Sequence, residues 1–544
     1  MKKALIISAF AISLIAGCKS GTDKKNTGGD NAATHNDTPV TPRNNEVSPA
    51  NAYNGLFLET KDVEKYITTQ KLDSNLANRL RSFYNARNYE YAWFDSTGLN
   101  EQAYGFRSLY DYSVDTSENN KALEYRLNAL MNNEQDSAIS ASDANIVKTE
   151  LQLTQRFINY FLDAHKDDKD AVKIMEHYVP MQKSDILKMA DAVISGKGYH
   201  STDIKNVYGD LTKELEKYTA IAKKGNWDSI PADKKKKYKK GDNSPVIASI
   251  KHRLQASGEL GGQDTTGVFD DALEAAVNKF EATHGHTPRG VITDTLIREM
   301  NVPAITIVEK ILINMERMRW IPTVPEGRLI MVNIPEFMLH AWDGKNKDFD
   351  MAVVVGKEGK STTSFSGDLN QVVFSPYWNL PRSIIKEEVL PAMSRNKGYL
   401  ASHHMEVTGE RNGVPVIRQV PGKENPLGRV KFLFPNSFNI YFHDTNQKEL
   451  FNRDQRAYSH GCIRLSDPVK MANYLLHDQP EWTAEKIDSA MNSGKEKYVR
   501  VKNPVPVMIT YYTTWVGADG QLHVVEDIYD HDRIMAAKLF TDAR

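Results

Sequence analysis

The sequence predicts a multidomain α+β protein with an all-α scaffold domain, a small three-helix domain and a mainly-β domain that carries an inserted capping subdomain. The chain has 544 residues, a length typical of three or four ordinary domains. Apolar residues recur at helical spacing up to about residue 327, and alternating β-branched and aromatic runs follow. Hydrophobic residues make up 40% of the chain, which is enough to fill several cores.

The overall charge excludes one class of partner. The formal net charge is -1, so no global field attracts nucleic acid or an anionic membrane, and we expect no nucleic-acid partner. The basic run at 234–237, with Lys239 and Lys240 after it, is local. Such a run is more typical of a solvated linker or helix end than of a contact with an acidic polymer.

Residues 1–17 have the pattern of a secretory signal peptide. Lys2 and Lys3 precede an apolar run, Ala4–Ala16, that is too short to span a bilayer comfortably. The sequence Ile-Ala-Gly-Cys at 15–18 resembles the bacterial lipobox. That resemblance implies that Cys18 becomes the lipidated first residue of the mature protein; the alternative is a plain signal peptide with a chance cysteine.

The stretch 18–52 is predicted to be a flexible tether. It is rich in Lys, Gly, Thr, Asn, Asp and Pro and poor in large apolar residues, so it cannot bury enough surface to fold. Several acyl chains on Cys18 would anchor the protein stably to a membrane. Lys19 and Ser20 follow the cysteine, without an aspartate. We therefore expect a periplasm-facing lipoprotein of the cell envelope, on the outer membrane.

Residues 53–240 are predicted to form a helical scaffold domain. Apolar residues recur at three- and four-residue spacing in KDVEKYITTQKL, NLANRLRSFYNARNYEYAWF and QLTQRFINYFLDAHK. No residue in this region carries recognisable chemistry. We expect its aromatic side chains to pack in a core.

Residues 241–303 are predicted to form three short helices. Val246, Ile250 and Leu254 share one helical face. The pattern K-x-R-L-x-x-x-G-x-L, followed by A-V-x-x-F-x-x-x-H-G and G-V-I, resembles peptidoglycan-binding domains attached to cell-wall enzymes. The alternative is a spacer bundle without binding. His284 and His286 are expected at a helix end, because two histidines without further ligands make a weak metal site.

A linker helix is expected at 304–327, and a mainly-β catalytic domain at 328–535. The runs RLIMVNIPEFMLHAW, FDMAVVVGK, NQVVFSPYWNLP and VKFLFPNSFNIYFHD are rich in β-branched and aromatic residues. Between the third and fourth runs lies a polar segment at about 384–428. A long insertion inside a sheet domain is a candidate lid.

Cys462 is the candidate nucleophile, because a thiol becomes reactive as a thiolate and a histidine can take its proton. Cys462 follows His443 by 19 positions, which leaves room for a loop to bring them together, and His460 lies in the same SHGC stretch. Gly461 would let a substrate approach closely. Two alternatives remain open: Cys462 as a buried small hydrophobe, and a zinc site made by His443, His460 and Cys462.

The stretch from His443 to SHGCIR at 459–464 resembles the signature of the L,D-transpeptidase catalytic domain of the YkuD type. Flanking sequences agree with this resemblance: VNIPEF, VVVGK, FSPYWNLPRSI and RQVPGKENPLGRVKFLFPN. They resemble the large branch of the family, in which a helical scaffold and a peptidoglycan-binding domain precede the catalytic domain. The resemblance covers most of the chain from residue 53 to about 535.

The resemblance implies a role for each matching residue. Cys462 is the nucleophile, His443 is the general base and acid, and the backbone carbonyl of Asp444 orients the imidazole. The N–H groups of Gly461 and Cys462 form the oxyanion hole. The substrate-binding candidates are His460, Ser459, Arg464, Tyr441 and Trp378; core packing is the alternative for Tyr441 and Trp378, and loop hydrogen bonding for Ser459.

The implied reaction is cross-linking of peptidoglycan between the third residues of two stem peptides, through a thioester on Cys462. The partners are a donor tetrapeptide and an acceptor stem, no metal or organic cofactor is required, and carbapenems should acylate Cys462. Hydrolysis of the thioester (an L,D-carboxypeptidase) and capture of a protein amine are alternatives within this chemistry. A cysteine peptidase is disfavoured because His443 precedes Cys462, and sortase-like spacing differs. A lipid-anchored scaffold without catalysis is the non-enzyme alternative.

Overall fold

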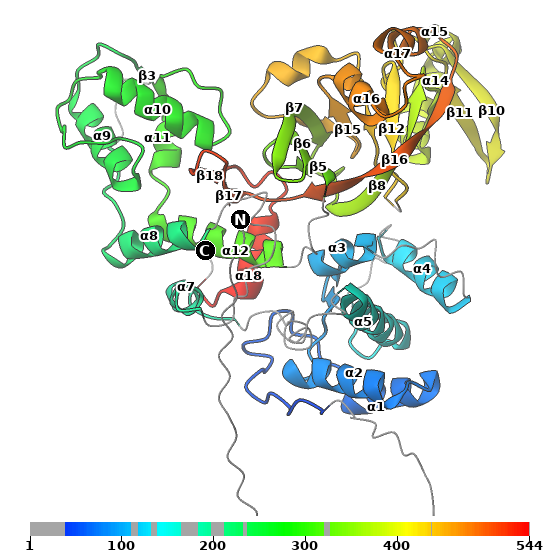
Figure 1. Ribbon diagram of the computed structural model, residues 1–544, viewed down its shortest axis with the longest axis horizontal. Helices are drawn as coiled ribbons and strands as arrows, with labels where there is room; N and C mark the ends of the chain where they lie inside the picture. Colours follow the sequence, from blue (N-terminus) through cyan, green and yellow to red (C-terminus); the bar gives the residue numbers. More distant parts are fainter. Residues whose placement is uncertain are drawn as a thin grey trace, which may run out of the picture.

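The computed structural model describes residues 39–109, 118–131, 139–164, 183–196, 211–231, 237–319, 327–436 and 438–542. The predictions for the signal peptide, for Cys18, for the tether up to residue 38 and for most of the basic run lie outside these residues. Figure 1 shows the small three-helix domain at one end of the molecule and the mainly-β domain at the other, with the first scaffold helices beneath the β domain. In the part of the chain that is described, no helix is both long and apolar enough to cross a membrane.

The last part of the predicted tether is ordered against the scaffold. The Asn44 N–H donates to the carbonyl of Asn85 at 2.8 Å, and the Thr41 N–H donates to Ser82 Oγ at 2.9 Å. Val47 is only 3% exposed. The prediction of a flexible tether through residue 52 is therefore wrong for this stretch. Its polar composition did not prevent ordering, because its backbone groups find partners on helix α2 (Ser74–Ala86).

The first core of the scaffold region is built by five helices around a cluster of aromatic rings. The helices are α1 (Thr60–Gln70), α2, α3 (Glu101–Leu109), α4 (Glu118–Met131) and α5 (Ala144–Ala164). The Trp93 ring lies 5.2 Å from Phe106 and 5.5 Å from Phe157, centroid to centroid. A short hairpin follows Trp93, formed by β1 (Phe94–Asp95) and β2 (Gly98–Leu99). The expectation that these aromatic residues form core is confirmed.

A second core lies between the scaffold and the β domain. Helices α7 (Ile186–Ile194) and α8 (Thr212–Lys223) pack there with α12 (Ala304–Arg319) and α18 (His531–Leu539). The hairpin of β17 (Thr514–Val516) and β18 (Leu522–Val524) joins the same core. Residues 53–240 thus contribute to three cores, because Ile230 and Tyr238 pack in the three-helix domain. The chain leaves the catalytic sheet after Thr510. The predicted boundaries did not anticipate either feature.

Helix α12 lies at the centre of this second core and is more than a linker. Its buried apolar residues include Ile305, Ile307, Val308, Ile311, Leu312 and Ile313. Such a wide apolar surface must be covered on several sides. Figure 1 shows α18, the C-terminal helix in red, lying beside α12.

The three helices expected between 241 and 303 are present and have their own core. They are α9 (Pro245–Ser257), α10 (Asp271–Thr283) and α11 (Asp294–Met300), with strands β3 (Lys237–Tyr238) and β4 (Ile292–Thr293) paired beside them. The His284 ring stacks on Phe280 with centroids 3.7 Å apart, and His286 Nε2 pairs with Glu299 at 2.9 Å. Both histidines lie at the end of α10 and the turn after it.

The β domain is a closed barrel. Its strands are β5 (Arg328–Asn333), β6 (Met338–Asp343), β7 (Asn346–Gly356), β8 (Phe365–Phe374), β12 (Val430–Leu433), β13 (Phe442–His443), β15 (Ile463–Leu465) and β16 (Lys497–Thr510). They pair in the order β7-β15-β13-β12-β8-β16-β5-β6, and β6 pairs back with β7 to close the ring. Strand β14 (Ala457–Ser459) attaches to β7 from outside the ring.

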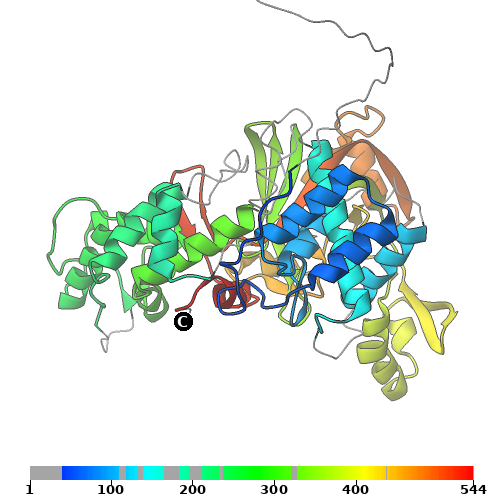
Figure 2. The ribbon, with the colours of Figure 1, turned by 90° about the horizontal axis from the view of Figure 1, so that it is seen from below.

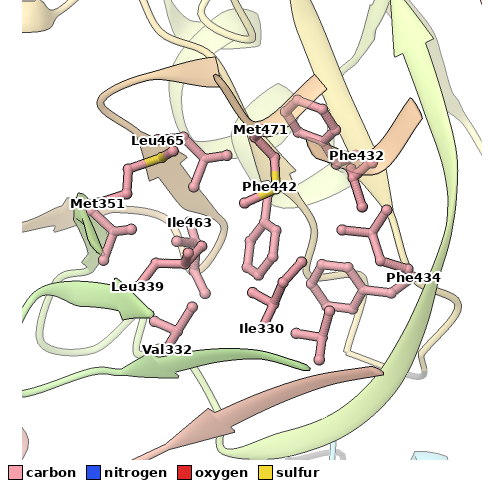
Figure 3. Close-up of a cluster of buried hydrophobic side chains, with 14 of the residues drawn as sticks. Ile330, Val332, Leu339, Met351, Phe432, Phe434, Phe442, Ile463, Leu465 and Met471 are labelled. Carbon is pink, nitrogen blue, oxygen red and sulfur yellow. The ribbon is translucent and has the colours of Figure 1, made fainter. Parts of the chain in front are cut away.

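Apolar side chains fill the barrel, as Figure 3 shows for Ile330, Val332, Leu339, Phe432 and Phe442. Two helices, α16 (Pro468–Leu476) and α17 (Ala484–Met491), pack onto the same core. The Asp467 side chain caps α16 by accepting from the N–H of Lys470 at 3.0 Å. Helix α16 thereby fixes the chain immediately after the SHGC stretch.

The insertion is a subdomain with its own small core. It contains β9 (Trp378–Asn379), α13 (Arg382–Ile384), the π-helix η2 (Ile385–Val389), α14 (Leu390–Arg395), α15 (Tyr399–Ser402), β10 (Met405–Arg411) and β11 (Val414–Gln419). Strands β10, β11 and β9 form a separate sheet, and Leu380, Ile384, Ile385, Val389 and Ile417 are buried beneath it. Figure 2 shows the β10–β11 hairpin projecting from the body of the molecule.

Candidate active site

The candidate catalytic residues lie on the outer face of two neighbouring barrel strands. Strands β13 and β15 run parallel, with Phe442 opposite Ile463 and His443 opposite Arg464. Phe442 and Ile463 are fully buried inside the barrel. Because side chains alternate along a strand, the residues on either side of them share the opposite face: Tyr441, His443, Cys462 and Arg464.

The backbone next to His443 fixes its tautomer. His443 Nδ1 lies 2.5 Å from the carbonyl oxygen of Asp444. A carbonyl can only accept, so Nδ1 carries the proton and Nε2 keeps a lone pair for use as a base. Burial, together with the nearby positive charge of Arg464, lowers the pKa of His443 to about 3. The imidazole is therefore neutral and able to accept a proton at neutral pH.

The carboxylate of Asp444 accepts hydrogen bonds from neighbouring backbone and side-chain donors, whereas its backbone carbonyl binds the imidazole of His443. The carboxylate accepts from the N–H groups of Arg429 at 2.9 Å and Thr445 at 2.7 Å, and from Lys448 Nζ at 2.7 Å. Gly428, at φ +61°, lies directly against it; a Cβ there would come within 2.5 Å of the Asp444 side chain. These contacts fix the Asp444 peptide and hence the carbonyl that orients His443.

Cys462 is half-buried, and its thiol is held between two groups. Sγ donates to the carbonyl oxygen of Asn439 at 3.6 Å, and the Tyr441 hydroxyl lies close enough to the sulfur to influence its pKa. Burial raises the pKa of the Cys462 thiol to about 11, even though the hydrogen bonds from Tyr441 and the charge of Arg464 act in the opposite direction. The Cys462 sulfur is therefore a neutral thiol and the His443 imidazole is also neutral, so a thiolate forms only as the proton leaves.

The SHGC loop is rigid because its members bond to one another. The Ser459 hydroxyl donates to the carbonyl of Cys462 at 2.5 Å and accepts from the N–H of Gly461 at 3.1 Å. Thr362 Oγ1 donates to the carbonyl of Gly461 at 2.8 Å. Gly461 has φ +112°, a conformation that strongly favours glycine.

One expected role changes with this geometry. We expected the N–H of Gly461 to help form the oxyanion hole, but the structure uses that donor for Ser459. The hydroxyl of Tyr441 is a donor close enough to the Cys462 thiol for each group to shift the pKa of the other. The sequence predicted Tyr441 in a core or a pocket wall and did not predict its proximity to the thiol. The signal was present: Tyr441 lies two positions before His443, so an extended strand puts both on one face.

Arg464 and Trp378 have different surroundings. Arg464 Nη1 donates to Gln447 Oε1 at 2.5 Å, and its charge acts on both His443 and Cys462. Trp378 is half-buried in β9 and packs against the core of the insertion. The structure brings Arg464 to the nucleophile and assigns Trp378 to the insertion.

His460 faces the insertion. Its Nε2 lies 3.3 Å from a carboxylate oxygen of Glu388 in the π-helix η2. A second contact lies beside the first, between Lys360 Nζ and Glu387 at 3.5 Å. Among the described residues, no group of three or more His, Cys, Asp or Glu side chains has a geometry that could hold a metal ion.

Sequence comparison matches two parts of the chain to known families. Residues 327–507 match the YkuD family model, described as the L,D-transpeptidase catalytic domain, and residues 78–224 match a model described as a scaffold domain. A Haemophilus influenzae protein named "Putative L,D-transpeptidase" is 31% identical over 243 residues, covering 42% of this chain and 49% of the relative. The chain thus matches about half the length of that curated relative.

Solved structures of similar proteins align only loosely. An L,D-transpeptidase from Stackebrandtia nassauensis is 12% identical, with a TM-score of 0.21, covering 52% of this chain and 95% of that one. An L,D-transpeptidase from Mycobacterium smegmatis is 14% identical, with a TM-score of 0.19, covering 35% and 60%. The assignment of the catalytic domain therefore rests on the family model and on the residues of the site.

Proposed function

The chain carries a YkuD-type L,D-transpeptidase catalytic domain behind a scaffold domain, and from this premise we propose that it cross-links peptidoglycan through a thioester on Cys462. The observation that carries the proposal is the shared outer face of β13 and β15. It presents Cys462, an imidazole with its Nδ1 proton held by the Asp444 carbonyl, and the Tyr441 hydroxyl. A nucleophile, an oriented base and a donor are the parts that acyl transfer requires.

The first step acylates the enzyme. Nε2 of His443 takes the Cys462 proton as Sγ attacks the carbonyl carbon of the third residue in a tetrapeptide stem. The hydroxyl of Tyr441 and the N–H of Cys462 stabilise the oxyanion that develops. The protonated imidazole then gives its proton to the leaving amine, so the C–N bond breaks, terminal alanine departs and a thioester remains. Since thiol and imidazole are both neutral beforehand, proton transfer accompanies attack.

The second step transfers the acyl group to the side-chain amine of a neighbouring stem. The amine nitrogen attacks the thioester carbon, the C–S bond breaks, and His443 carries a proton from nitrogen to sulfur. The product joins the third residues of two stems. The insertion lies against the catalytic loop through His460 and Glu388, where it can limit access of water to the thioester.

The remaining features of the chain fit an enzyme of the cell envelope. Lipidation at Cys18, a position facing the periplasm and binding of peptidoglycan by the α9–α11 domain are part of this proposal. We further propose that carbapenems acylate Cys462. Hydrolysis of the same thioester, as an L,D-carboxypeptidase, and transfer to a protein amine are alternative outcomes of the same acyl-enzyme.

Product analysis tests the proposal. The full chain and its Cys462→Ala variant, each purified in mild detergent, are incubated with a disaccharide-tetrapeptide, and the products are weighed by mass spectrometry. We expect a dimer lighter than two substrates by one molecule of alanine, only with Cys462 present. A tripeptide without dimer would indicate the carboxypeptidase. Unchanged substrate with folded wild-type protein would contradict both and favour the wall-binding scaffold.

A further inference from the structure

The π-helix of the insertion carries two neighbouring glutamates, one of which contacts the SHGC loop while the other contacts the connection between β7 and β8. Ile385 and Val389 of η2 are buried in the insertion core, whereas Glu387 and Glu388 between them are exposed. The hydrogen bonds of a π-turn span one more residue than those of an α-helix, and the turn rotates the side chains that follow it; such turns are frequent at functional sites. Here the turn lets the buried pair hold the helix while both glutamates face outward.

The two glutamates have different partners. Glu387 pairs with Lys360 at 3.5 Å, and a lysine carries a permanent positive charge. Glu388 pairs with the imidazole of His460 at 3.3 Å, and an imidazole does not carry a permanent charge. The charge of Glu387 is therefore compensated at all physiological pH values, while Glu388 remains able to receive another cation.

Glu388 is the glutamate whose side chain contacts a side chain of the SHGC loop. Its partner His460 lies two residues before Cys462, in the loop that Ser459 and Thr362 hold rigid. The side chains of Glu388 and His460 are 55% and 40% exposed, so a substrate arriving from solvent can reach them. Glu388 is thus an accessible carboxylate in contact with His460, two residues before the nucleophile.

We propose that Glu388 binds the ammonium group of the acceptor stem and delivers it to the acyl-enzyme. This inference rests on the proposed function, because it requires a thioester at Cys462. The acceptor amine is cationic in water at neutral pH, and a carboxylate is the group that binds an ammonium by charge-assisted hydrogen bonds. Water, the competing nucleophile, has no charge for Glu388 to attract, so Glu388 favours cross-linking over hydrolysis.

The transfer balances as follows. The acceptor ammonium displaces His460 from Glu388 and loses one proton to solvent, which leaves a neutral amine beside the thioester carbon. Its nitrogen forms the new C–N bond as the C–S bond breaks, and His443 moves the second proton from nitrogen to sulfur. An ammonium and a thioester thus give an amide, the Cys462 thiol and one released proton, without any oxidant, reductant or metal.

The test separates acylation from transfer. Wild-type full chain and Glu388→Gln are acylated with a disaccharide-tetrapeptide, and acyl-enzyme formation is timed by mass spectrometry. A tripeptide stem with a diamino third residue, which lacks the terminal alanine and cannot be a donor, is then added over a concentration series. We expect acylation within about twofold of wild type, an acceptor KM raised about tenfold, and a larger hydrolysed fraction, as for loss of one half-exposed charged hydrogen bond.

Two further variants and one small nucleophile test whether the effect on acceptor KM is specific to the Glu388 carboxylate. Glu387→Gln, in the same π-helix, should behave like wild type, and Glu388→Asp should recover part of the acceptor affinity. Hydroxylamine, which is mainly uncharged at neutral pH, should release the acyl group equally from wild type and Glu388→Gln.

Two outcomes would overturn the inference. One is an unchanged acceptor KM in Glu388→Gln; the other is an equal loss with hydroxylamine and with the stem, which would mean that Glu388 only holds the insertion in place. Failure of the wild-type protein to form any acyl-enzyme would instead remove the proposed function on which the inference rests.

Discussion

On the inner face of strands β13 and β15, Phe442 and Ile463 are fully buried among apolar side chains. On the outer face of the same two strands, the side chains of His443 and Cys462 each hydrogen-bond to a backbone carbonyl. The inner face stabilises the fold through its buried apolar area and close packing. The outer face positions the reacting groups through the direction of a few polar contacts. Substitutions on the two faces should therefore have different consequences.

Loss of the base should have the largest effect on activity. We expect His443→Gln to reduce the rate of acyl-enzyme formation by about 10²- to 10⁴-fold, because it removes the imidazole that takes the Cys462 proton in the proposed mechanism. Stability should change little. The measurement is the rate of acylation by a tetrapeptide donor, followed by mass spectrometry.

The matched control for this substitution is His477→Gln. His477 is exposed at the end of α16, and its Nδ1 also faces a backbone carbonyl, that of Tyr474 at 3.0 Å. It should acylate like the wild type. Equal losses of acylation rate in both variants would show that the effect is not specific to His443, and would contradict the proposed difference between the two faces.

Truncation on the inner face should act on stability instead. Phe442→Ala removes a fully buried ring whose centroid lies 4.8 Å from that of Phe434, and we expect a loss of about 3–5 kcal/mol in the free energy of unfolding. Chemical denaturation followed by tryptophan fluorescence measures it. Cys462→Ala, one strand away on the outer face, should lose less than about 1 kcal/mol. A similar loss in both would contradict the difference between the faces.

The pH dependence of the acylation rate tests the protonation states of His443 and Cys462. His443 is in its basic form above its lowered pKa of about 3, and Cys462 remains a thiol below its raised pKa of about 11. Between about pH 5 and pH 9 neither group changes its state, so the acylation rate should vary by less than about threefold. A bell-shaped profile with a limb between about pH 6 and pH 7 would indicate a preformed thiolate–imidazolium pair instead.

Much of the candidate site could be predicted from the sequence because its parts are close together in the chain. The SHGC stretch, the histidine 19 positions before its cysteine and the helix after Asp467 are local patterns. The structure pairs the two short strands that carry His443 and Cys462 in parallel register. The three short helices of residues 241–303 were predictable for the same reason, since each has its own periodicity and cap.

The contacts that the sequence did not reveal join distant segments. Glu388 meets His460 across 72 positions of the chain, and Lys310 of α12 donates to the carbonyl of Val525 across 215. Hydrophobic periodicity predicts which face of a helix or strand is buried, but it does not predict which other segment packs against that face. For that reason α12 was predicted to be a linker, although it lies at the centre of a core.

The sequence by itself determined the types of the elements, the chemistry of Cys462 and His443, and the presence of an insertion. Only the tertiary structure decided that the Gly461 N–H serves Ser459, that the Asp444 carboxylate holds the loop whose carbonyl orients His443, and that η2 brings Glu388 to the SHGC loop. The physical reason is the range of the interactions. Periodicity and motifs record a residue's neighbours along the chain, whereas hydrogen-bond direction is set by neighbours in space.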